Sequence, residues 1–83
     1  MSATDEAIEA IRKVVRHPGR EVAYVRLSKE EKIALIDLVA DHRHDELDVT
    51  ETLIVRIALN WLLNDYQQNG ERGVLARILA ASE

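Results

Sequence analysis

One seven-residue segment constrains the fold of this chain more than any other feature. In EVAYVRL, residues 21–27, the side chains alternate with the period of a β-strand, whereas the rest of the chain has helical patterns. A lone strand leaves its backbone N–H and C=O groups unpaired, so we expect it to pair with another strand. The obvious partner is the same segment of a second copy, and the alternation therefore favours a homodimer.

Two helix starts are marked by capping residues. Ser28, followed three residues later by Glu31, forms a capping-box pattern that predicts a helix over 29–42. Thr50 is the N-cap of a second predicted helix, 51–66. Both helices are apolar around most of their circumference, so each is expected to be covered on more than one side. The second helix keeps one thin polar stripe, made by Arg56, Asn60 and Asn64.

The remaining segments extend a single small domain over 20–66. Residues 1–19 predict an amphipathic helix and a turn, and residues 67–83 predict a C-terminal extension with a short helix. A chain of 83 residues buries a modest share of its surface, so association would supply the missing core. The composition, 47% hydrophobic with 4% aromatic residues, is typical of packed helices, and the absence of cysteine excludes disulfides.

The charges are unevenly placed along the chain. The net charge is −4, yet residues 11–32 hold seven Lys or Arg against three Glu, a local charge of +4. The stretch after residue 32 has a charge of −5. The net charge argues against a generic polyanion binder, but the chain is electrically polarised, with its basic end centred on the predicted strand.

The order of these elements resembles the ribbon-helix-helix family of DNA-binding proteins. The resemblance lies in VAYVRLSKEEKIALIDLVADH followed by VTETLIVRIALNWLLNDY, about half of the chain. It implies a mainly α fold with one short strand per chain, and an intertwined homodimer whose strands pair into an antiparallel β-ribbon. The extra N-terminal helix and the short C-terminal helix lie outside the matched region. The turn between the matched helices, HRHDELDV, is longer than usual in the family and lacks its common glycine.

A two-stranded ribbon fits the major groove of B-DNA, where every base pair shows a distinct pattern of donors and acceptors. The alternation turns one face of the strand inward, with Ala23, Val25 and Leu27, and the other outward, with Val22, Tyr24 and Arg26. The outward residues are the predicted base contacts, and an arginine can bind guanine in bidentate fashion. The reverse assignment of the two faces is the alternative, at the cost of burying Arg26.

In the family the second helix grips a DNA phosphate at its N-terminus, which maps to the Thr50 hydroxyl and the N–H groups of Glu51 and Thr52. Arg20 and Lys29 flank the ribbon and are further candidate phosphate contacts. The predicted dimer core consists of Ala23, Val25, Leu27, Ile36, Val39, Ile54, Ile57, Ala58, Trp61 and Leu62.

The resemblance implies a sequence-specific DNA-binding protein, in the simplest case a transcriptional repressor, with double-stranded DNA and a second copy of itself as partners. An antitoxin or a relaxosome accessory protein would use the same module. A protein-interaction dimer that does not bind DNA is an alternative of another class, favoured by the acidic net charge. No catalytic constellation, cofactor motif or membrane span is evident, and DHRHD, 41–45, fits a solvated turn better than a metal site. The acidic N-terminus is unlike a secretory signal, so we expect a cytoplasmic protein associated with the nucleoid or a plasmid.

Overall fold

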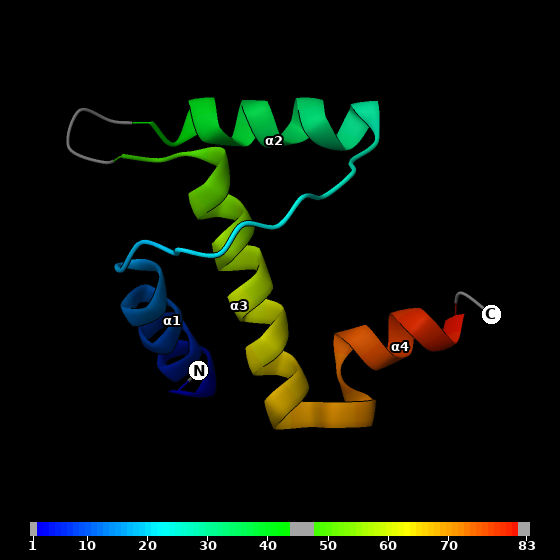
Figure 1. Ribbon diagram of the computed structural model, residues 1–83. Coiled ribbons are helices and arrows are strands. Elements are labelled where there is room, and N and C mark those ends of the chain that lie inside the picture. Colours follow the sequence, from blue (N-terminus) through cyan, green and yellow to red (C-terminus); the bar gives the residue numbers. More distant parts are fainter. Residues whose placement is uncertain (1, 44–47, 82–83) are drawn as a thin grey trace.

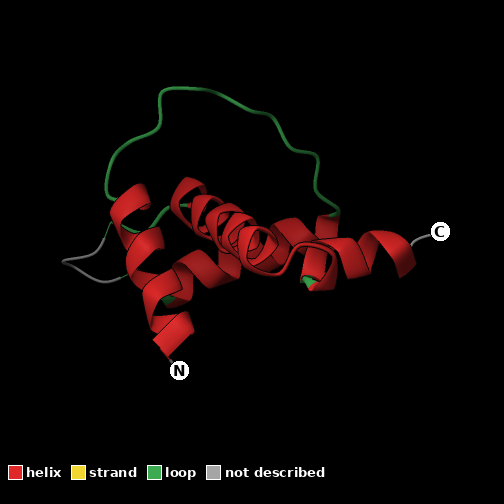
Figure 2. Ribbon diagram, turned by 90° about the horizontal axis from the view of Figure 1, so that it is seen from below, coloured by secondary structure: helices red, strands yellow, loops and turns green. Residues whose placement is uncertain are grey.

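The computed structural model describes residues 2–43 and 48–81, which form four α-helices and one short 3-10 helix (Figure 1). In chain order these are α1 Ser2–Val15, α2 Lys29–Asp41, α3 Glu51–Asn69, the 3-10 helix η1 Gly70–Arg72 and α4 Val74–Ala81. The long helix α3 lies in the middle: α2 crosses its first turns, and α1 and α4 lie on opposite sides of it (Figures 1 and 2). None of the described helices is long and apolar enough to cross a membrane.

The predicted strand is absent from the described residues, and the ribbon-helix-helix fold is therefore wrong, because that fold requires a β-ribbon. Residues 21–27 form an extended segment that arcs away from the helices (Figure 2). Within the described chain, residues 18–27 make no backbone-to-backbone hydrogen bond. Alternating side chains favour an extended backbone, but a strand also needs a neighbour to pair with, and this chain presents none.

Local capping explains where α2 and α3 begin. The Ser28 hydroxyl accepts a hydrogen bond from the Glu31 N–H at 3.1 Å, and the Glu31 carboxylate accepts one from the Ser28 N–H at 2.8 Å, so the predicted capping box is confirmed. At the start of α3 the Thr50 hydroxyl accepts from the Leu53 N–H at 3.1 Å, which confirms Thr50 as the N-cap. The helix α3 continues to Asn69, beyond residue 66 where the sequence pattern ended it.

An arginine of α3 caps the end of α1. The Arg56 guanidinium donates to the carbonyl oxygens of His17 at 2.6 Å and Val14 at 3.2 Å. The last carbonyl groups of a helix lack partners within it and carry the negative end of its dipole, so a cation stabilises them. Arg56 thereby caps the C-terminal end of α1 from a position about forty residues further along the chain.

A carboxylate fixes the start of α4. One oxygen of Asp65 accepts from the Val74 N–H at 2.7 Å, and the other accepts from the Asn69 side-chain amide at 2.9 Å. Gly73 is buried beside this carboxylate, and a Cβ there would lie 2.6 Å from the Asp65 oxygen. Gly70 ends α3 with a φ of +52°, a conformation that favours glycine. These contacts set the direction in which α4 leaves the body.

The core of the single chain is small. Among the described residues only Ile11, Val39 and Val49 are buried hydrophobic residues. The chain exposes 7619 Å², whereas a compact monomer of 9.4 kDa exposes about 5,000 Å². Its radius of gyration is 14.5 Å, against about 12 Å for a compact domain of this length. Much apolar surface that folding normally covers is therefore left open.

Candidate nucleic-acid interface

The three predicted base contacts lie on the extended segment, and all are exposed. Tyr24 is 97% exposed and Val22 is 77% exposed, and Arg26 is exposed beside them. The residues predicted to face inward are exposed too, with Val25 at 68% and Leu27 at 42%. In this single chain neither face of the segment packs on the helices, so the structure leaves all of these side chains accessible to a partner.

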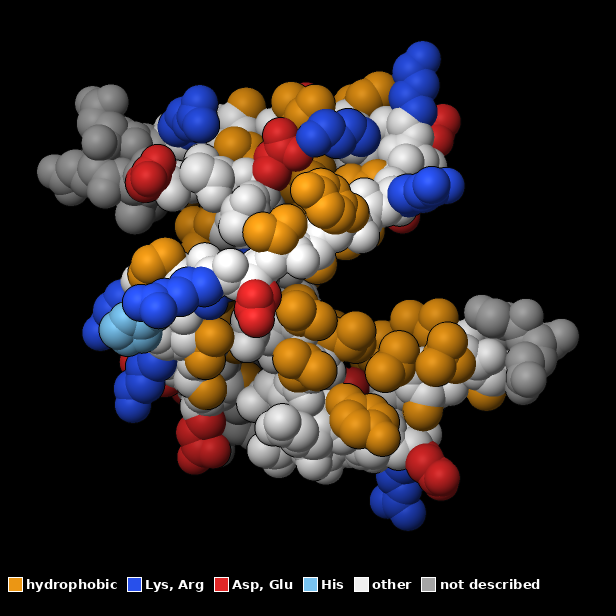
Figure 3. All heavy atoms as spheres, in the orientation of Figure 1, with side chains coloured by type: hydrophobic (Ala, Val, Ile, Leu, Met, Phe, Trp, Pro, Cys, Tyr) orange, Lys and Arg blue, Asp and Glu red, His pale blue; other side chains and the backbone are white. Residues whose placement is uncertain are grey.

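Basic side chains gather at both ends of this segment, at the end of α1 and at the start of α2 (Figure 3). Residues 11–32 contain seven Lys or Arg side chains, and two of these form ion pairs: Arg12 with Glu9 at 3.1 Å, and Lys32 with Glu51. Within the described chain, the other five make no side-chain hydrogen bond or ion pair. They are Lys13, Arg16, Arg20, Arg26 and Lys29. These five cations, which include both predicted flanking phosphate contacts, form what we call the basic segment, Lys13–Lys29.

The predicted phosphate site at the start of α3 keeps some of its donors. The Thr50 hydroxyl is already occupied in capping Leu53, but the N–H groups of Glu51 and Thr52 precede the first intrahelical hydrogen bond and have no acceptor among the described residues. The Glu51 carboxylate, which would repel a phosphate, is held by Lys32 of α2. The two residues are nineteen positions apart, and no sequence pattern signals this pair.

Most of the predicted dimer core is exposed in the single chain. Val39 is buried, at 8% exposed, and Ile54 and Leu62 are half-buried. The other seven are exposed: Ala23, Val25, Leu27, Ile36, Ile57, Ala58 and Trp61. A role in a dimer interface stays a prediction for all ten, and the structure provides the open surface that such a role needs.

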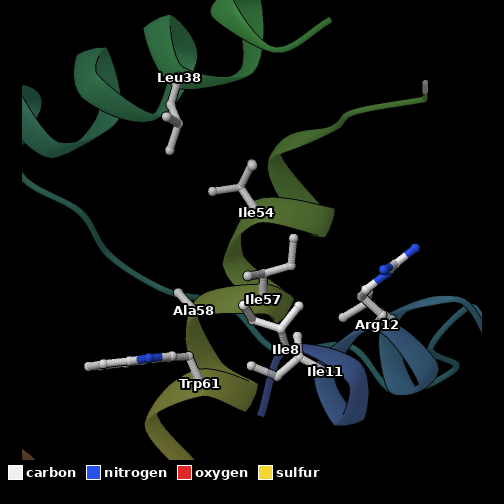
Figure 4. Close-up of a pocket in the computed structure, with 9 residues that line it drawn as sticks. Ile8, Ile11, Arg12, Leu38, Ile54, Ile57, Ala58 and Trp61 are labelled. Carbon is white, nitrogen blue, oxygen red and sulfur yellow. The ribbon is translucent and has the colours of Figure 1, made fainter. Parts of the chain in front are cut away.

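Three helices surround an apolar groove of about 520 Å³ (Figure 4). Trp61 lies along one side of it and is 50% exposed. Apolar side chains from α1, α2 and α3 form most of the remaining lining: Ile8, Ile11, Val15, Leu38, Ile54, Ile57 and Ala58. Arg12 is the one charged lining residue, and its guanidinium is paired with Glu9. The groove therefore suits an apolar surface rather than a polar substrate.

Sequence reasoning missed this groove because four of its nine lining residues come from α1, which lies outside the region of resemblance. The apolar stripe of α1 indicated a buried face but not what covers it. His44 and Asp45 of the 41–45 segment lie outside the described residues. Among the residues described, no group of three potential metal ligands comes together.

Comparison of the chain with family models, with curated proteins and with solved structures gave no match.

Proposed function

We propose that this protein is a homodimer that binds double-stranded DNA through its basic segment and acts in the cytoplasm as a transcriptional repressor, by occupying its operator. The observation that supports this most is the set of five cations without intramolecular partners along one exposed stretch of chain. Cations that are not engaged within the protein can replace the counterions of the DNA backbone, which supplies most of the affinity for a duplex.

Sequence preference would come from exposed side chains of the basic segment, including the cation Arg26 itself. Arg26 and Tyr24 offer hydrogen-bond donors, and Val22 offers an apolar contact for a thymine methyl group. Because the segment lies free of the helices, these side chains can approach base edges without any helix moving. Phosphate contacts at Glu51 and Thr52 would fix the position of the body on the duplex.

Selection of bound duplexes from a random library, followed by affinity measurements on the enriched site at several salt concentrations, tests the proposal. With five free cations per chain, the logarithm of the affinity falls with the logarithm of salt concentration with a slope of at most about −4.5 per chain. Arg26→Ala is expected to weaken binding about 5- to 150-fold and to relax the preference at one base position. Arg72→Ala, which removes an exposed arginine outside the basic segment, is the matched control.

Two results would contradict the proposal. One is an affinity that does not change with salt, since phosphate contacts always release counterions. The other is an equal loss of affinity in Arg26→Ala and Arg72→Ala, which would mean that the basic segment has no special part in binding.

A protein-interaction dimer without DNA binding is the second candidate, because so many large hydrophobic side chains are exposed. On α3 alone Leu59, Trp61 and Tyr66 are each 50% exposed or more. Under this function the protein is dimeric, no duplex is enriched from the library, and alanine at Arg26 changes nothing in the association of the two chains.

A further inference from the structure

We propose that α4 of each chain seats in the apolar groove between α1, α2 and α3 of a second copy, so that two copies exchange their C-terminal helices around a two-fold axis. The inference rests on the homodimer of the proposed function and names the surfaces that form it. A two-fold dimer of this kind uses the same pair of surfaces twice, once in each direction.

The helix α4 is apolar and largely uncovered, as expected of a helix that packs into a groove of another chain. Arg77 is its only charged residue, and the other seven are Val, Leu, Ile or Ala. Leu79 is 59% exposed and Val74 is 36% exposed. Among the described elements α4 touches only α3 and η1, and it projects to one side of the body (Figure 1). An apolar helix held out in this way is not covered by its own chain.

The direction of α4 is fixed. The bond from the Val74 N–H to Asp65 and the close approach of Gly73 to the same carboxylate determine how the helix begins. The turn therefore holds α4 out from the body in a defined direction, and a helix that is already formed and oriented costs less to order on binding.

The groove matches this helix in chemistry. The volume of the groove is about 520 Å³, and its lining is apolar apart from Arg12. Beside Trp61 the surface continues to a polar rim that includes Glu6 and Asp65. The carboxylates of this rim would attract Arg77 of the inserted α4.

The occupant must come from another copy. In both views α1 and α4 lie on opposite sides of α3, and the two helices make no contact (Figures 1 and 2). The chain's own α4 thus cannot reach the groove without unwinding the turn that Asp65 holds.

The amount of open surface fits a second copy. The chain exposes about 2,600 Å² more than a compact monomer of its mass. A specific interface needs about 800 Å² from each partner, so this excess is more than enough for a dimer even when the 18–27 segment stays uncovered.

Pairs of introduced cysteines test this arrangement directly, because the natural chain has none. We expect full-length Leu79→Cys mixed with full-length Ile8→Cys to form a disulfide-linked pair of twice the chain mass on mild oxidation. Leu59→Cys is the matched control: it is 53% exposed, and it lies on the face of α3 opposite the groove residues Ile57 and Trp61. A Leu79→Cys chain that couples equally well to both partners, or to neither, overturns the inference.

Sedimentation of charged variants gives a second measurement. Leu79→Glu is expected to weaken dimerisation at least tenfold, whereas Leu59→Glu, at a similarly exposed site, leaves the dimer intact; circular dichroism verifies the helix content of both. A Leu79→Glu protein with the natural dimer dissociation constant refutes the inference.

Neither assay involves DNA. Cross-linking without duplex binding refutes only the DNA-binding function, and duplex binding by a dimer that does not cross-link refutes only the role of α4.

Discussion

Replacing Arg56 by methionine tests whether one guanidinium attaches α1 to the rest of the chain. The substitution keeps the aliphatic stem and removes the hydrogen bonds to His17 at 2.6 Å and Val14 at 3.2 Å. A hydrogen bond from a charged donor contributes about 1.5–3 kcal/mol when well shielded. These two lie near the surface, where solvent screens them, so a combined loss of about 1–2 kcal/mol is the reasonable expectation.

The loss is large enough to measure by thermal unfolding. For a chain of this size each kcal/mol lowers the melting temperature by about 4–8 °C. Circular dichroism reports the helices, and the fluorescence of the single tryptophan, Trp61, reports the docking of α1, since Ile8 and Ile11 line the same groove. All proteins are compared at one concentration, because dimerisation makes stability depend on concentration.

Two further variants make the test specific. Arg56→Lys keeps the charge but loses the planar guanidinium that reaches two carbonyl oxygens. Its melting temperature should therefore fall between those of the natural protein and Arg56→Met. Arg72→Met removes an arginine that has no partner among the described residues and should leave the melting temperature unchanged. If Arg56→Met and Arg72→Met have the same melting temperature, the two hydrogen bonds contribute nothing measurable to stability, and the proposed attachment of α1 by Arg56 is refuted.

Two other substitutions test the contacts that shape the helix ends. Gly73→Ala places a Cβ 2.6 Å from the Asp65 carboxylate, so that carboxylate must shift and its bond to the Val74 N–H is weakened; we expect weaker dimerisation in sedimentation, and an unchanged dissociation constant would contradict the role of this turn. Ser28→Ala removes the hydroxyl that accepts from the Glu31 N–H and should cost about 1 kcal/mol in chemical unfolding, with Ser28→Thr close to the natural protein. Equal unfolding midpoints for the alanine and threonine variants would show that this cap is not stabilising.

The parts of the fold that local chemistry determines were predictable from the sequence. Ser28 with Glu31, and Thr50, mark helix starts through contacts within three residues, and both starts are where the patterns placed them. The end of α3 was not predictable, because the polar residues after Tyr66 look like a turn whereas the helix continues to Asn69. There Asn69 and Asp65 bond to each other one turn apart, which stabilises the last turn.

The contacts that decide the arrangement join residues far apart in the chain. In the sequence Arg56 is one member of a polar stripe, and nothing nearby shows that it caps α1. The strand prediction at 21–27 was wrong for a related reason. Alternation of side chains is a local property, whereas a strand needs backbone hydrogen bonds to a neighbour, and residues 21–27 make none within the described part of the chain.

The two proposed surfaces do not compete. Of the cations in residues 11–32, only Arg12 lines the groove, and none belongs to α4. Dimerisation through these surfaces therefore leaves the five cations of the basic segment accessible to DNA phosphates. The net charge of −4 is no obstacle either, because exposed charges are screened beyond about 8 Å at physiological salt. The molecule extends over 40 × 33 × 27 Å, several times that length. A duplex bound at the basic segment would interact mainly with the charges of that segment. A dimer would present the basic segment twice.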